Sequence, residues 1–272
     1  MPSSPDSSPA RPPRGTRGSR LLSTGSMPPP MAPAPASSMA FTLLQTTCLS
    51  GCWQMAIDAA LLELGHPVLR LYSWSRPTLS LGFHQRSITA SWRDWQAGHQ
   101  GELVRRPTGG GAVLHGGDLC YALVWPEPGC SRQQAYTQIC DWLQRVFAAL
   151  GEPLRFGHEP CAVGHDCFAR STPADLVDGR GCKRIGSAQR WHRGCLLQHG
   201  SIQLTPDSDQ WLTLLGSQAP ALSPLAVNAE SLAEQLRQEA CNWLSLSATP
   251  QPLPASLLSR AGARLEQHRI NS

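Results

Sequence analysis

Three consecutive glycines, Gly109 to Gly111, stand between two stretches that predict β-strands, "ELVRRP" and "DLCYALVWP". Consecutive glycines let backbone N–H groups approach a ligand closely, so such a loop can hold an anion or a carbonyl oxygen. The spacing is not that of a P-loop, and no helix pattern follows, so neither a P-loop nor a Rossmann dinucleotide-binding turn is indicated. Taken alone, the glycines are equally typical of a tight turn that binds nothing.

The residues before this loop predict a helix and two strands. "SGCWQMAIDAALLELG" offers Ser50 as an N-cap, apolar residues at helical spacing and Gly65 as a stop. "VLRLYSW" and "TLSLGFHQ" alternate with period two on either side of Arg76-Pro77, as paired strands would. A short helix over "SWRDWQAG" then leads into the strand "ELVRRP".

The residues after the loop predict one long helix, two further strands and a helical end. "SRQQAYTQICDWLQRVFAALG" combines Ser131 as a cap, a regular apolar stripe and Gly151 as a terminator. "ADLVDGRGCKRIGSAQRW" and "GCLLQHGSIQL" predict strands separated by turns at "DGRG" and "RWHRG", and two or three helices follow over roughly residues 207–268. This order lacks regular βαβ alternation, so it predicts an α+β fold with a mixed or antiparallel sheet and flanking helices.

Residues 1–40 differ in composition from the rest of the chain. They are rich in Pro, Ser, Gly and Arg and have little apolar surface to bury, so we expect a disordered extension before a domain over residues 41–272. Four arginines and one aspartate give this segment a net charge of +3, out of the formal +4 of the whole chain. The remaining charge of +1 does not indicate a protein that binds nucleic acid. A targeting peptide, a flexible tail and a true start at Met39 all fit this composition.

Cysteine usage and hydropathy indicate a cytoplasmic protein. The ten cysteines form neither a dense framework nor a C-x-x-C pair, which fits free thiols in a reducing compartment. No window approaches the ~18 consecutive apolar residues of a membrane helix, so we expect no membrane span. "CAVGHDC" brings Cys161, His165 and Cys167 near His158, but the spacing matches no common zinc pattern and we expect no metal.

Lys183 is the only lysine of the chain, against 22 arginines. An ammonium is a compact charge that can shift its pKa and move a proton, whereas a guanidinium stays protonated. The predicted strands place Lys183 just after a hairpin turn on a sheet. Either a chemical role or an ordinary exposed lysine at a turn explains this position.

The arginine pair Arg105-Arg106, the glycine loop with His115, and the later "CKRIGSAQRW" and "LLQHGS" together resemble the superfamily of lipoate-protein ligases, biotin ligases and octanoyltransferases. The likeness begins at "WQMAIDAALLEL" and runs to about Leu204. It implies the biotin/lipoate ligase catalytic-domain fold, in which the glycine loop and the lysine-bearing strand enclose an acyl chain. It also implies that Lys183 holds the substrate carbonyl. The other substrate-binding residues that it implies are Arg106, Gly109, Gly110, Gly111, Ala112, Val113, Leu114, His115, Gly186 and Ser187.

"GHDCFARS" resembles the Cys-Phe site of cysteine octanoyltransferases of the LipM type, which makes Cys167 the expected nucleophile. The resemblance implies that octanoyl passes from octanoyl-acyl carrier protein to Cys167 and then to a lysine of a lipoyl domain or glycine-cleavage H protein, without a cofactor. Lys183 would lower the pKa of the Cys167 thiol, and backbone donors around Gly110 and Gly111 would form an oxyanion hole.

Two departures from that pattern concern the turn before Lys183. "DGRGC" is one residue longer than expected for the LipM type, and Cys182 is a rival thiol beside the lysine. Because adjacent strand residues point to opposite faces, Cys182 and Lys183 should not share the pocket. His199, on a predicted strand, is expected to be a hydrogen-bonded structural residue rather than a base.

Three other functions fit the same motifs. An ATP-dependent lipoate ligase would use ATP and Mg²⁺ and would not need Cys167, although about 230 residues after the tail leave little room for an accessory domain. An amidotransferase would use the same cysteine with another lipoyl protein as donor. A non-catalytic lipoyl-domain-binding protein would need neither Cys167 nor Lys183. The sequence leaves the donor, the acceptor and the oligomeric state open.

Deleting residues 1–38 should leave thermal stability and acyl transfer unchanged, because this segment has almost no apolar surface to contribute to the core. The measurement compares the melting temperature and transfer rate of the shortened and full chains. A clear loss of either quantity would show that the segment belongs to the folded domain.

Overall fold

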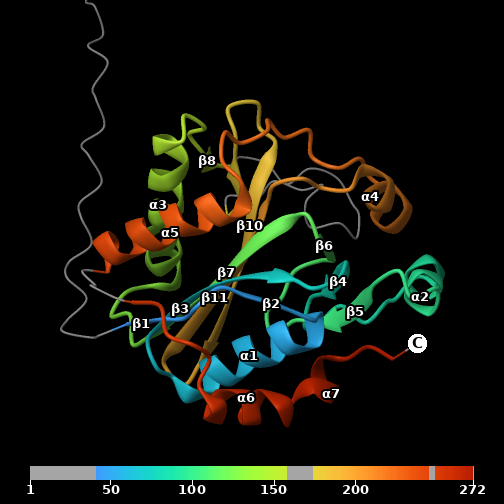
Figure 1. Cartoon of the computed structure of the whole chain (residues 1–272), viewed down its shortest axis with the longest axis horizontal. Helices are drawn as coiled ribbons and strands as arrows, with labels where there is room; N and C mark the ends of the chain where they lie inside the picture. The colour runs from blue at the N-terminus through green and yellow to red at the C-terminus, as the bar shows by residue number, and fades with distance from the viewer. Residues whose placement is uncertain (1–40, 158–173, 245–248, 272) are drawn as a thin grey trace, which may run out of the picture. The chain divides into compact units, whose positions relative to one another are not determined.

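The computed structural model describes residues 41–157, 174–244 and 249–271, all within the unit Ala34–Ser272 (Figure 1). The large sheet contains β1 Thr42–Leu43, β2 Thr47–Leu49, β3 Val68–Trp74, β7 Asp118–Pro126, β8 Arg155–Phe156, β9 Leu176–Val177, β10 Lys183–His192 and β11 Cys195–Gln203. The small sheet contains β4 Thr78–Leu81, β5 Glu102–Arg105 and β6 Val113–His115. The helices are α1 Gly51–Leu64, α2 Ala90–Ala97, α3 Arg132–Ala149, α4 Ser208–Leu215, α5 Ala229–Trp243, α6 Ala255–Gly262 and α7 Leu265–His268.

The large sheet runs in the order β1-β3-β7-β11-β10-β9-β8, with β2 also joined to β3. The strands from β3 to β8 along this path pair antiparallel, whereas β1 and β2 pair parallel with β3. The small sheet has the order β5-β4-β6, with one parallel and one antiparallel pair. The predicted α+β class with a mixed sheet is confirmed.

Strand β7 shows why helices cover both faces of the large sheet. Leu119, Tyr121 and Leu123 belong to a core shared with α3 and α5, whereas Cys120 and Ala122 belong to a second core shared with α1 and α6. Successive side chains of a strand point to opposite faces, so an apolar run without alternation requires cover on both sides. Figure 1 shows α3 and α5 on one side of the sheet and α1 and α6 on the other.

Three of the four residues that were predicted to begin or end a helix have that role in the structure. Ser131 forms a capping box with Gln134 at the start of α3, and Gly65 ends α1 in the left-handed conformation at φ 64°. Gly151, just past α3, also has a positive φ of 78°. Ser50 precedes α1 without a side-chain cap bond, and the N–H of Gly51 instead donates to Glu102 Oε2 at 2.7 Å.

One predicted pairing is wrong. The strands "VLRLYSW" and "TLSLGFHQ" do not pair with each other, because β3 lies in the large sheet and β4 in the small one. Both edges of β3 are occupied, one by β1 and β2 and the other by β7, so β4 finds its partners in β5 and β6 instead. Four helices rather than two or three follow residue 207 in the described part of the chain, because α7 is a separate single turn.

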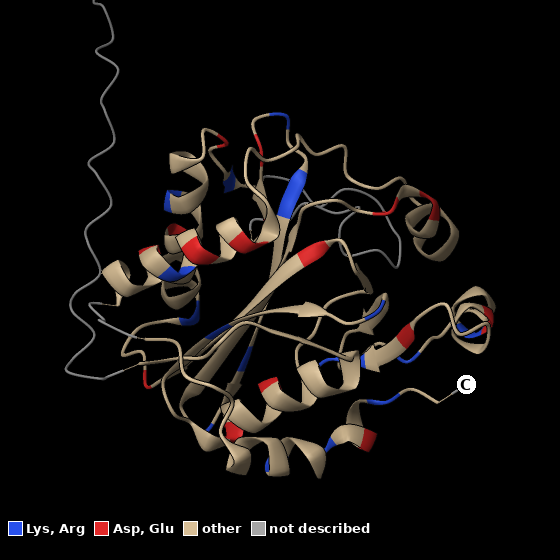
Figure 2. Ribbon diagram, viewed as in Figure 1, with Lys and Arg blue, Asp and Glu red and all other residues tan. Residues whose placement is uncertain are grey.

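The charged side chains of the described residues are spread over many elements. Figure 2 shows basic and acidic positions interspersed on helices, turns and strand ends rather than collected along one stripe. Within the described ranges, no helix combines the length and the apolar character needed to span a membrane.

A buried ion pair joins α1 to the large sheet. Asp58 Oδ1 lies 3.0 Å from Arg70 Nε of β3, and both side chains are almost fully buried. The hydroxyl of Tyr72 donates to Asp58 Oδ2 at 3.2 Å, and His199 Nδ1 lies 2.7 Å from the same oxygen. Burial acts to raise the pKa of Asp58, but Arg70 and the bond to His199 outweigh it and hold that pKa below its ordinary value.

Asp58→Asn should lower the free energy of unfolding at neutral pH by about 3–5 kcal/mol, because it leaves Arg70 buried without its carboxylate. Since the pKa of Asp58 is depressed in the folded state, this stability is present above the ordinary carboxyl pKa of 3.8 and is lost as the pH falls below it. Urea unfolding of the parent and the variant at several pH values measures both effects.

Glu266→Gln is the matched control, because it removes an exposed carboxylate 3.1 Å from Arg269. Its cost should be about 0–1 kcal/mol. Equal costs for the two variants would contradict the assigned role of the Asp58–Arg70 pair.

Candidate active site

The glycine loop between β5 and β6 is organised by Arg106. This buried guanidinium donates to the carbonyl oxygens of Gly109 at 2.7 Å, Gly111 at 2.7 Å and Ser80 at 2.9 Å. In a planar trans peptide the C=O and the following N–H point in opposite directions. The N–H groups of Gly110 and Ala112 therefore point away from Arg106, as required of donors to a bound carbonyl or oxyanion.

Two glycines make the shape of this loop possible. Gly110 has a φ of 99°, which L side chains rarely adopt. A Cβ on Gly82, one residue past β4, would lie 1.9 Å from the carbonyl oxygen of Gly110. The loop and the end of β4 are therefore in backbone contact, and a side chain at residue 82 would force the loop to move.

The start of the loop is fastened to β10 and β11 of the large sheet. Arg190 Nη1 donates to the carbonyl of Pro107 at 2.9 Å, and the hydroxyl of Thr108 lies 2.6 Å from His199 Nε2. The other ring nitrogen of His199 contacts Asp58, so the imidazole is hydrogen-bonded on both sides, as expected from the sequence. An Asp58–His199–Thr108 chain thus connects α1 to the glycine loop.

A second chain of the same kind lies at the far end of the loop. His115 Nδ1 is 2.6 Å from Asp118 Oδ2, and its Nε2 is 2.8 Å from Ser80 Oγ. Ser201 and Cys120 both donate to Asp118 Oδ2, at 2.6 and 3.2 Å. Burial acts to raise the pKa of Asp118, but His115 and the hydrogen bonds hold it below its ordinary value.

His115, Asp118 and Cys120 are also the group of possible metal ligands found among the described residues, with ligand atoms within 4.8 Å of one another. Ligand atoms about 2.0–2.1 Å from a tetrahedral zinc ion stand roughly 3.3 Å or more apart. The 2.6 Å between His115 and Asp118 is instead a hydrogen-bond distance. Hydrogen bonding therefore accounts for this cluster as it stands.

Lys183 is the first residue of β10, directly after the turn that Asp178 holds through the N–H groups of Arg180 and Cys182. Its side chain is only 5% exposed, and its Nζ lies 2.9 Å from Asp175 Oδ1. The predicted hairpin position is confirmed. The alternative of an ordinary exposed lysine at a turn is wrong, because this ammonium is buried.

Gly186 and Ser187 follow on the same strand. Ser187 Oγ lies 2.8 Å from the hydroxyl of Tyr121, which also accepts a hydrogen bond from Gln198 at 2.9 Å. Gly200 is opposite Ser187 in the β10–β11 register, and a Cβ there would meet the Tyr121 ring at 2.5 Å. Tyr121 and Ser187 therefore lie on the face of the large sheet that α3 and α5 cover.

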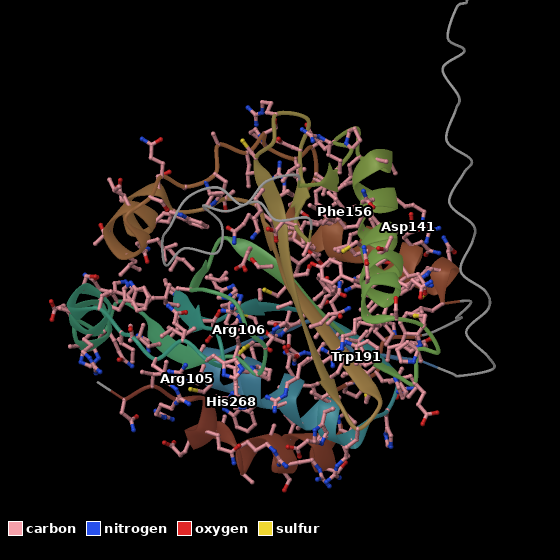
Figure 3. The ribbon with its side chains drawn as sticks, turned by 180° about the vertical axis from the view of Figure 1, so that it is seen from behind. Arg105, Arg106, Asp141, Phe156, Trp191 and His268 are labelled. Carbon is pink, nitrogen blue, oxygen red and sulfur yellow. The ribbon has the colours of Figure 1, made fainter. Side chains whose placement is uncertain are left out.

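A hollow of about 170 Å³ opens beside the start of the loop. Figure 3 shows three of its lining residues, Arg105, Arg106 and His268, near one another. Its remaining lining residues are Ala59, Leu62, Glu63, Phe83, Pro107, Arg190, His192 and Gln267. The hollow therefore combines apolar, cationic and acidic groups at the base of the glycine loop.

The expected nucleophile Cys167 lies outside the described residues, as do His158, Cys161 and His165 of the rejected zinc reading. Cys182 is described and is half-buried in the turn before Lys183. The described residues resume at Ala174, directly before the carboxylate that contacts Lys183.

The sequence profile of the family "Lipoyl protein ligase A/B catalytic domain" matches residues 51–241. The chain belongs to this family. The octanoyltransferase LipM of Oceanobacillus iheyensis is 38% identical over 176 residues, 61% of this chain and 64% of that protein. The octanoyltransferase LipM of Kyrpidia tusciae is 33% identical over 249 residues, 85% of this chain and 90% of that protein.

A crystal structure of lipoate-protein ligase A bound with ATP has the same fold, with a TM-score of 0.69 and 19% identity. The match covers 84% of this chain and 95% of the ligase chain. The predicted ligase-type catalytic-domain fold is confirmed by this match. The family match also spans the glycine loop and Lys183, which are the two parts of the site built above.

Three of the expected substrate-binding residues also have structural roles in the fold. The side chains of Ala112 and Leu114 pack in a core with Trp92 and Trp95, so only their backbone faces the loop side. Arg106 was expected to recognise the ligand. Its guanidinium instead donates to the backbone of the loop itself, so it also has a structural role.

Sequence analysis missed Asp58, Thr108, Asp175 and Arg190. Asp58 alone carried a signal, because it lies three residues from both Met55 and Leu61 on the apolar side of a predicted helix. A carboxylate in phase with an apolar stripe requires a buried partner. Nothing in "PADLVDG" distinguishes Asp175 as the partner of Lys183, since only the folded hairpin brings the two together.

Arg106→Ala should leave the domain folded but weaken use of the acyl donor about tenfold or more in kcat/KM, because each lost charge-assisted hydrogen bond contributes ~1.5–3 kcal/mol to holding the loop. Thermal unfolding and initial-rate kinetics measure the two effects. Arg105→Ala is the neighbouring control, since its guanidinium binds the carbonyls of Gly82 and Gln85 outside the loop. Unchanged kinetics in Arg106→Ala would show that the hydrogen bonds from Arg106 to the loop do not support acyl transfer.

Proposed function

We propose that this chain is an acyltransferase that moves octanoyl from octanoyl-acyl carrier protein to a protein lysine through a thioester on Cys167. It acts in protein lipoylation, and its acceptors are a lipoyl domain or the glycine-cleavage H protein. Octanoyltransferase is the name of relatives at 33–38% identity. We place the reaction in the cytoplasm, in keeping with the many unpaired thiols.

The observation that carries the proposal is the burial of the only lysine at the head of β10. An ammonium that is 5% exposed is costly unless its charge is used or compensated. Here the ammonium lies on the strand that continues through Gly186 and Ser187 to the residue that fastens the glycine loop, Arg190. This is the arrangement expected of a group that holds the carbonyl of an acyl chain.

The first half-reaction exchanges one thioester for another. The Cys167 thiolate attacks the octanoyl carbonyl, the C–S bond to the carrier breaks, and the carrier leaves as a thiol after taking up a proton. Lys183 stabilises the thiolate and the developing oxyanion by its charge, and the outward N–H groups of Gly110 and Ala112 supply further donors. Thioester exchange needs no nucleotide, so we propose no cofactor.

The second half-reaction forms the amide. The neutral ε-amine of the acceptor lysine attacks the Cys167 thioester, and the C–S bond breaks as the amine loses a proton. The thiolate of Cys167 is regenerated beside Lys183. The acceptor lysine belongs to the partner protein, because this chain contains no lysine besides Lys183.

The proposal is tested by intact-mass analysis after incubation with octanoyl-acyl carrier protein. The parent and Cys182→Ala should each gain one octanoyl group that hydroxylamine removes, because thioesters are labile to this amine. Cys167→Ala should gain none. Adduct formation on Cys167→Ala would remove Cys167 from the reaction, and its loss in Cys182→Ala alone would move the nucleophile to the turn.

A further inference from the structure

Among the described residues, Asp175 forms an ion pair with the proposed catalytic ammonium of Lys183. Its Oδ1 lies 2.9 Å from Lys183 Nζ, and the two side chains are 6% and 5% exposed. Most ion pairs of the described residues lie at the surface, where at least one partner is substantially exposed. The pair at Lys183 is enclosed and belongs to the site.

The backbone of Asp175 is held from two elements. The hydroxyl of Tyr136 on α3 donates to the carbonyl of Ala174, and the N–H of Gly157 next to β8 donates to the carbonyl of Asp175 at 2.9 Å. Directly after it, Leu176 and Val177 form β9, and Val177 lies opposite Lys183 in the β9–β10 register. The carboxylate is therefore fixed relative to the strand that carries the ammonium.

Two titratable groups of the described residues near Asp175 are neutral at physiological pH. Burial raises the pKa of Cys140 on α3 to about 12, and it raises the pKa of Tyr136 well above its ordinary value. Neither side chain therefore competes with Asp175 as an anionic partner of Lys183. Without the carboxylate, the lysine head group would lose the ion pair that fixes its direction.

We propose that Asp175 is a positioning residue for acyl transfer, which fixes the direction of the Lys183 ammonium within the buried site. The proposal rests on the proposed function, since it assigns Asp175 a task only through Lys183. A lysine ammonium has three N–H donors. One of them is directed to Asp175, which fixes the direction of the head group within the buried site.

The chain offers an unusually clean probe, because Lys183 is its only lysine. Protein labelled with ¹³C and ¹⁵N lysine gives a single side-chain signal, whose NMR chemical shifts report the surroundings of the ammonium directly. In Asp175→Asn this signal should move from its position in the parent, because the ammonium loses the carboxylate 2.9 Å away. The rate of octanoyl adduct formation should fall about tenfold or more, because a misplaced charged group stabilises the thiolate and the oxyanion less well.

Asp178→Asn is the matched control. Asp178 is also buried and lies three residues further along, but it accepts hydrogen bonds from the backbone of Arg180 and Cys182, which an asparagine oxygen can replace. The lysine signal and the adduct rate should both stay at the parent values. If Asp175→Asn behaves like this control in either measurement, the proposal is overturned.

Two further measurements keep the test decisive. If Asp175→Asn does not fold, Asp175→Glu takes its place: its longer side chain displaces the carboxylate, so the lysine signal and the adduct rate should both change, and parent values for both would overturn the proposal. If the parent forms no octanoyl adduct, the proposed function fails, but the lysine signals of the parent and Asp175→Asn still decide whether Asp175 positions Lys183.

Discussion

The antiparallel pairing of β10 with β11 is the constraint on which the site depends. Its register runs without interruption from Ile185 opposite Ile202 to His192 opposite Cys195. It places His199 beside Ala188, so that the strand that binds the loop start through His199 is paired directly with the strand that begins with Lys183. A slip of one residue would turn every one of these side chains to the opposite face of the sheet.

Around this strand pair, three of the buried carboxylates of the described residues each lie next to a buried cation or imidazole. Asp58 meets Arg70 and His199, Asp118 meets His115, and Asp175 meets Lys183. Buried charges are costly unless they are paired and hydrogen-bonded. Two of these carboxylates reach the glycine loop and its sheet through a histidine, and the third reaches the proposed catalytic lysine. The polar interior thus fixes the two sides of the site relative to the core.

Much of this arrangement could be predicted from the sequence, because it is local. The examples are the cap of α3 at Ser131, the stop of α1 at Gly65, the hairpin before Lys183, and the strands β5 and β7 on either side of the glycine loop. The short strand β6 between the loop and β7 was not predicted. A long apolar run also identified β7, and apolar stripes identified α1 and α3, two of the helices that cover it. The resemblance of the motifs to lipoate-protein ligases then led to the family, which the comparisons confirmed.

The parts that the sequence did not reveal are those that depend on long-range pairing. Whether β3 and β4 pair is decided by β1, β2 and β7, which occupy both edges of β3. The partner of Lys183 depends on the β9–β10 hairpin, and the role of Arg106 as a clamp depends on how the loop folds back. Spacing in the sequence contains no information about such contacts when the residue types, Asp and Arg, are common on surfaces.

The central claim is that octanoyl reaches the acceptor lysine through a thioester on this chain. The donor supplies octanoyl that is already activated as a thioester, so no ATP is needed. The most direct measurement is a single-turnover transfer to a lipoyl domain, followed by mass spectrometry of both proteins, with octanoyl-acyl carrier protein alone or with free octanoate plus ATP and Mg²⁺. The account predicts that the first donor modifies the lipoyl domain without nucleotide, and that an octanoyl adduct on this chain rises and then decays as the product forms. Modification that occurs only with the free acid and ATP, with no adduct on the chain, would contradict it.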